Sequence, residues 1–185
     1  SALFRSKDGG LNWQKLTVEL ADECPAVIIP RVTALMVDPV AHNNVWAGIE
    51  VDGVRHSKDG GDTWEVVKEG VTDPDIHNFT ITVGPPKTLL TITPREIFSS
   101  TDDGVNWEPV SVLKQVSIPY CRAVVVKPDD PQVIFIGNGE SAFGGVGALH
   151  RSGDRGKTWE TLPLPVEPNG TVWDLAAHPA DSDFL

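Results

Sequence analysis

The chain has 185 residues, a formal net charge of −11 and 40% hydrophobic residues, which is typical of a soluble globular protein. No apolar run approaches the roughly 20 residues that span a bilayer, so we expect no membrane insertion. The negative field repels phosphate backbones, so we expect no nucleic-acid partner and consider protein or carbohydrate ligands instead.

The chain begins with a short strand and a turn whose pattern then recurs. Residues 1–5 predict the strand. Ser6–Trp13 follows, with an Asp two residues after the Ser, then a Gly, and a Trp seven residues after the Ser. The pattern returns at Ser57–Trp64, Ser100–Trp107 and Ser152–Trp159, and apolar residues flank each copy on both sides. Each copy therefore predicts a β-hairpin closed by an Asp-Gly turn.

The residue types of this turn suit a structural role. The Gly adopts backbone angles that other residues disfavour, and the Asp and Ser side chains can bond to backbone groups within the turn. The Trp can bury its ring between neighbouring sheets and donate its indole N–H to a carbonyl. The predicted structural residues are Ser6, Asp8, Gly10, Trp13, Ser57, Asp59, Gly61, Trp64, Ser100, Asp102, Gly104, Trp107, Ser152, Asp154, Gly156 and Trp159.

A second repeated segment lies between the turns. It is a near-continuous apolar run, as expected of a strand buried on both faces. These inner strands are predicted at residues 31–39, 77–85, 120–128 and 171–179. A second strand is predicted after each of the first three, at residues 45–48, 89–92 and 133–136.

Each complete unit therefore contains four strands, and the units repeat at roughly 40–50 residues, the range of β-propeller blades. We predict an all-β propeller with antiparallel blades at about residues 31–73, 74–116 and 117–166. A fourth blade is predicted to be split between residues 1–30 and 167–185. Three assemblies are compatible with this pattern: a closed four-bladed ring, an excerpt from a larger propeller, and a ring built from two copies. We favour the excerpt.

The turns resemble a known family motif. The pattern Ser-x-Asp-x-Gly-x-Thr-Trp, kept in full at Ser57–Trp64 and Ser152–Trp159, is similar to the Asp-box, or bacterial neuraminidase repeat. Ser6–Trp13 and Ser100–Trp107 have Asn in place of Thr. The resemblance implies a sialidase-like propeller with the boxes at its periphery. The family includes sialidases, xyloglucanases, sortilin-type receptors and photosystem II assembly factors, so the resemblance alone selects no activity.

Candidate ligand-binding residues lie at the starts of the inner strands, on the face opposite the turns. They are Arg31, His77, Tyr120 and Arg122. Cationic and aromatic side chains near the central channel could bind a carboxylate or a sugar ring. The competing interpretation is that these residues face solvent or bond to loop carbonyls.

A long loop at Gly137–Gly147 joins the predicted second and third strands of the last complete unit. Extended loops on a rigid scaffold often carry binding residues, and Glu140 is the only charged residue in this one. We therefore add Glu140 to the candidate ligand-binding residues.

The sequence departs from the sialidases at the positions that their chemistry needs. Sialidase activity would imply three arginines, a Tyr–Glu nucleophile pair and an acid/base Asp. This chain has one tyrosine, Tyr120, and its segment Ile28–Arg31 has residues similar to the family's arginine motif in another order. We name no catalytic residue and favour a non-catalytic binding or scaffold propeller. The alternative is a fragment of a glycoside hydrolase with two opposed carboxylates. Its acids would come from Glu50, Asp52, Asp73, Asp75 and Glu140.

Histidines and cysteines show no ligand spacing. Cys24 and Cys121 form no CxxC pair, and the five histidines are not paired, so we expect no metal site and no cofactor. The expected partners are a protein or carbohydrate ligand, with self-association or further blades of the same propeller as additional possibilities. The sequence does not decide the compartment.

Overall fold

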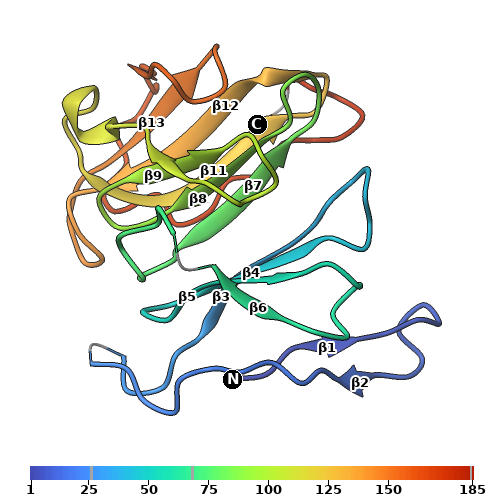
Figure 1. The fold of residues 1–185 in the computed structure, drawn as a ribbon. Helices are drawn as coiled ribbons and strands as arrows, with labels where there is room; N and C mark the ends of the chain where they lie inside the picture. Colours follow the sequence, from blue (N-terminus) through green and yellow to red (C-terminus); the bar gives the residue numbers. More distant parts are fainter. Residues whose placement is uncertain (26, 68, 184) are drawn as a thin grey trace.

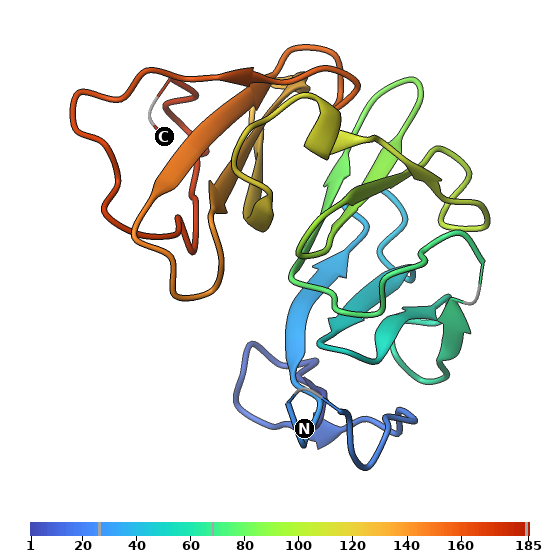
Figure 2. The ribbon, with the colours of Figure 1, turned by 90° about the vertical axis from the view of Figure 1, so that its left-hand side faces the viewer.

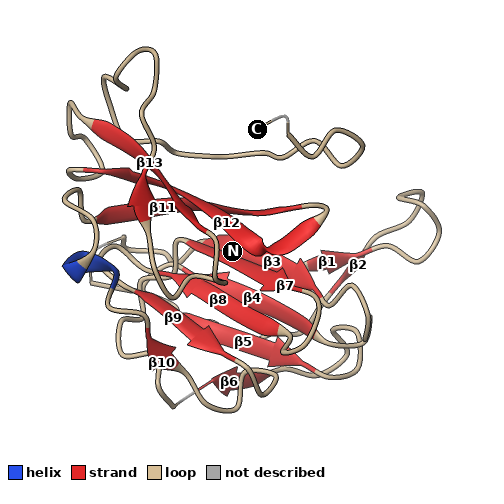
Figure 3. Ribbon diagram, turned by 90° about the horizontal axis from the view of Figure 1, so that it is seen from above, coloured by secondary structure: helices blue, strands red, loops and turns tan. Residues whose placement is uncertain are grey.

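The computed structural model describes all residues except 26, 68 and 184, and the described chain is almost entirely β-structure (Figure 1; Figure 3). Three four-stranded antiparallel sheets follow one another, preceded by a two-stranded hairpin. The hairpin pairs β1 (Phe4–Arg5) with β2 (Gln14–Lys15). One short 3-10 helix, Val112–Lys114, lies between the second and third sheets.

Each sheet is a simple meander in which every strand pairs with the next in sequence. Sheet I contains β3 (Val32–Val37), β4 (Val45–Ile49), β5 (Gly53–Ser57) and β6 (Glu65–Val67). Sheet II contains β7 (Asn78–Thr82), β8 (Thr88–Ile92), β9 (Ile97–Ser100) and β10 (Glu108–Pro109). Sheet III contains β11 (Tyr120–Lys127), β12 (Asp130–Gly139), β13 (Gly147–Ser152) and β14 (Glu160–Thr161).

The sheets are arranged as an arc, face to face, with the two chain termini at opposite ends (Figure 2). The core consists of the layers between neighbouring faces. Trp46 and Phe79 pack between sheets I and II, and Leu90 and Ile134 pack between sheets II and III. Leu3 packs against sheet I in a smaller third layer. The predicted hairpins, the second strands and the first three inner strands are therefore all present.

The fourth predicted inner strand, at residues 171–179, is not formed. The segment runs along β12, with one backbone hydrogen bond from the Val172 N–H to the Asn138 carbonyl, and carries only an isolated bridge between His178 and Asp181. An apolar sequence is insufficient here, because a strand needs a neighbour with which to exchange backbone hydrogen bonds. Among the described residues, no strand forms a ladder of backbone hydrogen bonds with this segment.

The predicted loop at Gly137–Gly147 is shorter than expected. β12 extends to Gly139 and β13 begins at Gly147. Gly137 and Gly139 lie under residues 171 and 172, and a Cβ atom at either glycine would collide with them. These glycines therefore permit close packing inside a strand rather than marking a loop.

Candidate functional site

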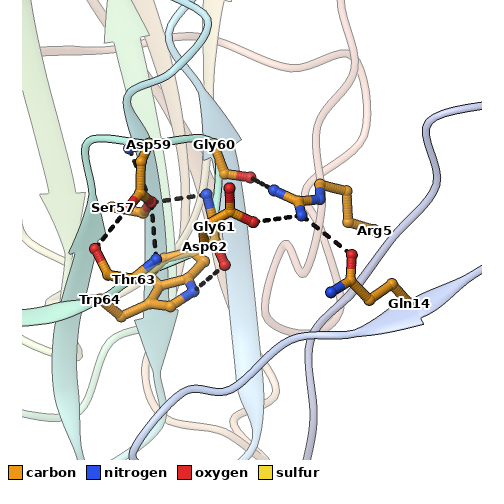
Figure 4. Close-up of polar contacts among 9 residues, drawn as sticks. All are labelled: Arg5, Gln14, Ser57, Asp59, Gly60, Gly61, Asp62, Thr63 and Trp64. Carbon is orange, nitrogen blue, oxygen red and sulfur yellow. Dashed lines mark hydrogen bonds and ion pairs between the residues drawn. The ribbon is translucent and has the colours of Figure 1, made fainter.

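The four repeated turns share one set of hydrogen bonds. In each copy the Ser Oγ donates to the Asp Oδ1 at 2.8 Å. The same Oγ accepts the backbone N–H of the Gly four residues after the Ser. The Trp Nε1 donates to that Gly carbonyl at 3.0–3.1 Å. Figure 4 shows the copy at Ser57–Trp64, where Arg5 of the preceding hairpin also binds the Gly60 carbonyl and Asp62. The motif therefore closes its own loop.

The two copies with Asn in place of Thr keep the same bond. Asp8 Oδ2 accepts from the Asn12 side chain, as Asp59 Oδ2 accepts from the Thr63 hydroxyl. The Asn12 side chain and backbone and the Ser6 hydroxyl lower the pKa of Asp8 to about 2. The Asn106 backbone and side chain similarly lower the pKa of Asp102 to about 2. These carboxylates are ionised acceptors held within the turn and are not suited to proton transfer.

The other end of the strands carries the predicted ligand-binding residues. Arg31 directly precedes β3, and Glu50 directly follows β4. The Arg31 Nε lies 2.5 Å from Glu50 Oε2, and its Nη2 lies 3.0 Å from Glu50 Oε1. Glu50 is buried, so this two-point ion pair neutralises Arg31 and orients it.

His77 and Tyr120 lie together where sheets II and III meet. Their ring centroids are 5.0 Å apart in an edge-to-face arrangement. The buried His77 ring places Nδ1 2.7 Å from the Cys121 carbonyl, so Nδ1 is the donor, and Nε2 lies 3.6 Å from Asp75 Oδ2. His77 therefore links the two sheets through a carbonyl of strand β11, whereas the sequence interpretation considered only solvent or loop carbonyls as its partners.

Arg122 occupies a β-bulge in β11, between the paired residues Cys121 and Ala123. A bulge redirects a side chain, and here the Arg122 guanidinium lies 4.7 Å from the centre of the Trp173 ring. Trp173 is itself exposed. Burial raises the pKa of Tyr120, and the negative charges of Asp75 and Glu50 add to this effect while Arg122 opposes it.

These contacts repeat from sheet to sheet. The Thr33 hydroxyl donates to the Ile76 carbonyl at 2.5 Å, and His77 donates to the Cys121 carbonyl. Arg122 makes the next contact of the series by stacking on Trp173. Thr33, His77 and Arg122 hold equivalent positions in the repeat, and each contacts the start of the next inner segment. Spacing within the repeat could have revealed this equivalence, but it could not have identified Trp173 as the partner of Arg122.

Glu140 lies apart from this cluster. Its Oε2 accepts the Gly145 N–H at 3.1 Å and so closes its own loop. Within the described chain, no hydrogen bond or ion pair joins Glu140 to the other four candidate residues. The structure instead brings Asp75 into the cluster, and its buried Oδ1 has no hydrogen-bond partner among the described residues.

Among the residues that the structure describes, no group of three or more His, Cys, Asp or Glu side chains is arranged to hold a metal ion. No helix in these residues has the length and apolar character needed to cross a membrane.

No protein-family model matches the chain. A curated relative, an uncharacterized membrane glycoprotein of Saccharomyces cerevisiae, is 28% identical over 103 residues, covering 52% of this chain and 21% of the yeast protein. The chain thus spans about a fifth of this relative.

Solved structures share the fold. The GH74 xyloglucanase from Xanthomonas campestris is similar with a TM-score of 0.63 and 18% identity, over 97% of this chain and 31% of that chain. YCF48 bound to D1 peptide is similar with a TM-score of 0.61 and 19% identity, over 90% of this chain and 48% of that chain. This chain has a β-propeller fold. At these identities the likeness concerns architecture alone.

Proposed function

We propose that the chain is a non-catalytic binding propeller of the Asp-box type. Its ligand, a protein or a glycan, would bind the inner-strand face, defined here by Arg31, His77, Tyr120, Arg122 and Trp173. The four turns with identical hydrogen bonds support the Asp-box assignment, because they reproduce the motif's serine, aspartate and tryptophan pattern around one loop geometry.

The Tyr120–Arg122–Trp173 arrangement carries the proposal. Arg31 is neutralised by Glu50, but Arg122 forms no ion pair with a carboxylate in the described chain and instead lies against an exposed indole. A guanidinium can bind a ligand carboxylate, and an exposed tryptophan ring can stack on a sugar or a planar side chain. YCF48 in its solved complex binds a D1 peptide, which is a precedent for a peptide ligand on this fold.

Arrays of neutral glycans and of extended peptides, probed with the purified chain, test this proposal. We expect binding that Arg122→Gln or Trp173→Ala lowers about 5- to 30-fold, since each removes one contact worth roughly 1–2 kcal/mol. Val105→Ser is the matched control, because Val105 is an exposed apolar residue in a turn at the opposite end of the strands. Binding that survives both substitutions on the inner-strand face would contradict the assignment.

The second candidate function is that of a glycoside hydrolase fragment. Asp75 favours it, because its carboxylate lies beside His77 and has one buried oxygen without a partner. The likeness to a GH74 xyloglucanase suggests xyloglucan as the first substrate to try. Release of reducing sugar that Asp75→Asn abolishes and Glu140→Gln leaves intact would establish this function in place of the binding one.

A further inference from the structure

At the end of the strands that carries the repeated turns, three charged residues join sheets I and II. The Lys87 ammonium, from the loop between β7 and β8, binds the buried Asp38 carboxylate at 2.6 Å. It also forms an ion pair with Asp103, in the turn that follows β9. The cation at this junction therefore has two counterions within the chain.

The junction between sheets II and III has different residues at the same three positions. Counting along the paired strands from the serine of each turn gives the counterparts of Asp38, Lys87 and Asp103, which are Thr82, Gln132 and Arg155 in that order. A hydroxyl and an amide have replaced the first carboxylate and the ammonium, and a cation has replaced the second carboxylate. The Thr82 Oγ1 is buried and has no hydrogen-bond partner among the described residues.

Arg155 is oriented but has no counterion. Its Nη1 donates to the Pro86 carbonyl of sheet II at 2.5 Å, which leaves the Nε and Nη2 edge of the guanidinium unused. In the described chain, neither Arg155 nor the exposed Lys157 forms an ion pair. Two neighbouring unpaired cations in a chain of net charge −11 create a local positive potential.

Both cations line a cavity of about 460 Å³ between sheets II and III, and this volume is in the range of ligand sites. The hydroxyls of Thr88 and Ser99 and the Gln132 amide contribute polar groups to its wall. Asp154 also lines the cavity, but both of its carboxylate oxygens accept hydrogen bonds from its own turn. The lining therefore offers cationic and neutral polar groups to a ligand.

The rest of the lining favours a peptide over a sugar. Pro85, Pro86 and Val110 supply apolar surface that an apolar side chain can contact. Among the described residues that line the cavity, none has an aromatic ring on which a sugar could stack.

We propose that this cavity binds an acidic peptide segment of a partner protein. A glutamate or aspartate of the peptide accepts from the free edge of Arg155, and so supplies the counterion that Asp38 supplies to Lys87 at the preceding junction. Lys157 attracts a second carboxylate, and the hydroxyls and the Gln132 amide bond to the peptide backbone. The site lies at the turn end of the strands, away from the inner-strand face, and does not depend on the function proposed above.

Fluorescence anisotropy with the labelled peptide Glu-Ala-Glu-Ala-Glu tests this proposal on the 185-residue chain, and Gln-Ala-Gln-Ala-Gln is the neutral control. We expect binding of the acidic peptide alone. Arg155→Gln should weaken it about tenfold or more, because a charge-assisted contact is lost. Lys157→Gln should weaken it about threefold, since this cation is exposed.

The matched control is Arg95→Gln, which removes the same charge. Arg95 is exposed, lies between β8 and β9 at the other end of sheet II, and forms no ion pair in the described chain, so this variant should bind normally. An acidic peptide that does not bind, or that binds Arg95→Gln as weakly as Arg155→Gln, would overturn the proposal. Tighter binding of trigalacturonic acid than of the peptide would overturn the choice of a peptide ligand.

Amide chemical shifts of the unmodified chain locate the site without any substitution. Titration with the acidic peptide should shift the Gly156 and Lys157 amide signals, which belong to the turn beside the cavity. The equivalent amides of Gly61 and Asp62, in the turn of sheet I, should not move. Shifts confined to residues outside the cavity would contradict the assignment.

Discussion

The first and third turns have the same local structure in different surroundings. In both, the Ser, Asp and Trp side chains make the same hydrogen bonds. Trp107 is nevertheless only 4% exposed and meets the Phe79 ring edge to face at 5.8 Å, whereas Trp13 is 64% exposed. The turn therefore forms from its own residues, but its contribution to stability depends on the neighbouring sheet. Matched substitutions in the exposed and the buried copies of the turn would separate these two contributions.

The largest difference should appear at the tryptophans. Trp107→Ala should lower the free energy of unfolding by about 3–5 kcal/mol, because it leaves a cavity between sheets I and II. Trp13→Ala should cost less than about 1 kcal/mol, because its ring is already in water. Urea unfolding of both variants measures this. Similar losses would mean that the tryptophan acts mainly through its own turn.

Ion pairs between neighbouring units should also stabilise the fold more where they are buried than where they are exposed. Asp38 is fully buried and accepts the Val40 and Ala41 N–H groups and, at 2.6 Å, the ammonium of Lys87, which lies between β7 and β8. Asp38→Ala should cost about 3 kcal/mol, because it leaves the Val40 and Ala41 N–H groups without their acceptor and leaves Lys87 with only its ion pair to Asp103.

The corresponding link at the first hairpin is largely exposed. Arg5 lies 2.5 Å from Asp62, whose side chain is in contact with water. Asp62→Ala should cost less than about 1 kcal/mol. Thermal unfolding of the Asp38 and Asp62 variants side by side checks the comparison, and equal losses would show that burial of the link does not matter.

The serines test whether water can replace a hydrogen bond of the turn. Ser100 is buried, so Ser100→Ala should leave the Gly104 N–H unsatisfied and cost about 1–3 kcal/mol. Ser6→Ala should cost roughly 0.5 kcal/mol or less, because the Gly10 N–H can bond to water. Hydrogen exchange at these two glycine amides resolves the effect locally. Loss of protection at Gly10 alone would contradict the expected order.

The smallest effect at neutral pH concerns His150 in sheet III. Its ring is fully buried, and burial lowers its pKa to about 4. The unfolded chain, with an ordinary histidine pKa of about 6.5, takes up the proton first as the pH falls. The free energy of unfolding should therefore decline as the pH falls from about 6.5 towards 4. His150→Gln should flatten this part of the profile, while His42→Gln, at an exposed site, should not.

The repeated sequence predicted the four-strand order of each sheet and the place of the four repeated turns, because apolar runs and Asp-Gly chemistry act over a few residues. It was wrong at residues 171–179, where strand formation depends on a distant partner. It also overestimated the loop after residue 136, because the glycines there make room for residues 171 and 172.

The candidate site shows the same division. Spacing alone predicted that Arg31, His77, Tyr120 and Arg122 begin inner strands. Spacing did not indicate that Glu50 neutralises Arg31, or that Trp173 stacks on Arg122. Those pairings join residues from separate strands or sheets, and their ligand-binding role stays a prediction.

The sequence by itself determined the hairpins, the closing hydrogen bonds of the four turns and the repeat that orders the sheets, since all of these arise between residues close along the chain. Only the tertiary structure decided which of the equivalent side chains are buried and which polar groups are paired. It also left Leu35 and Val37 of β3 exposed, although Ala47 and Ile49 of β4 pack against Leu3. Burial and charge pairing depend on whether a neighbouring sheet supplies the apolar surface and the partner atoms.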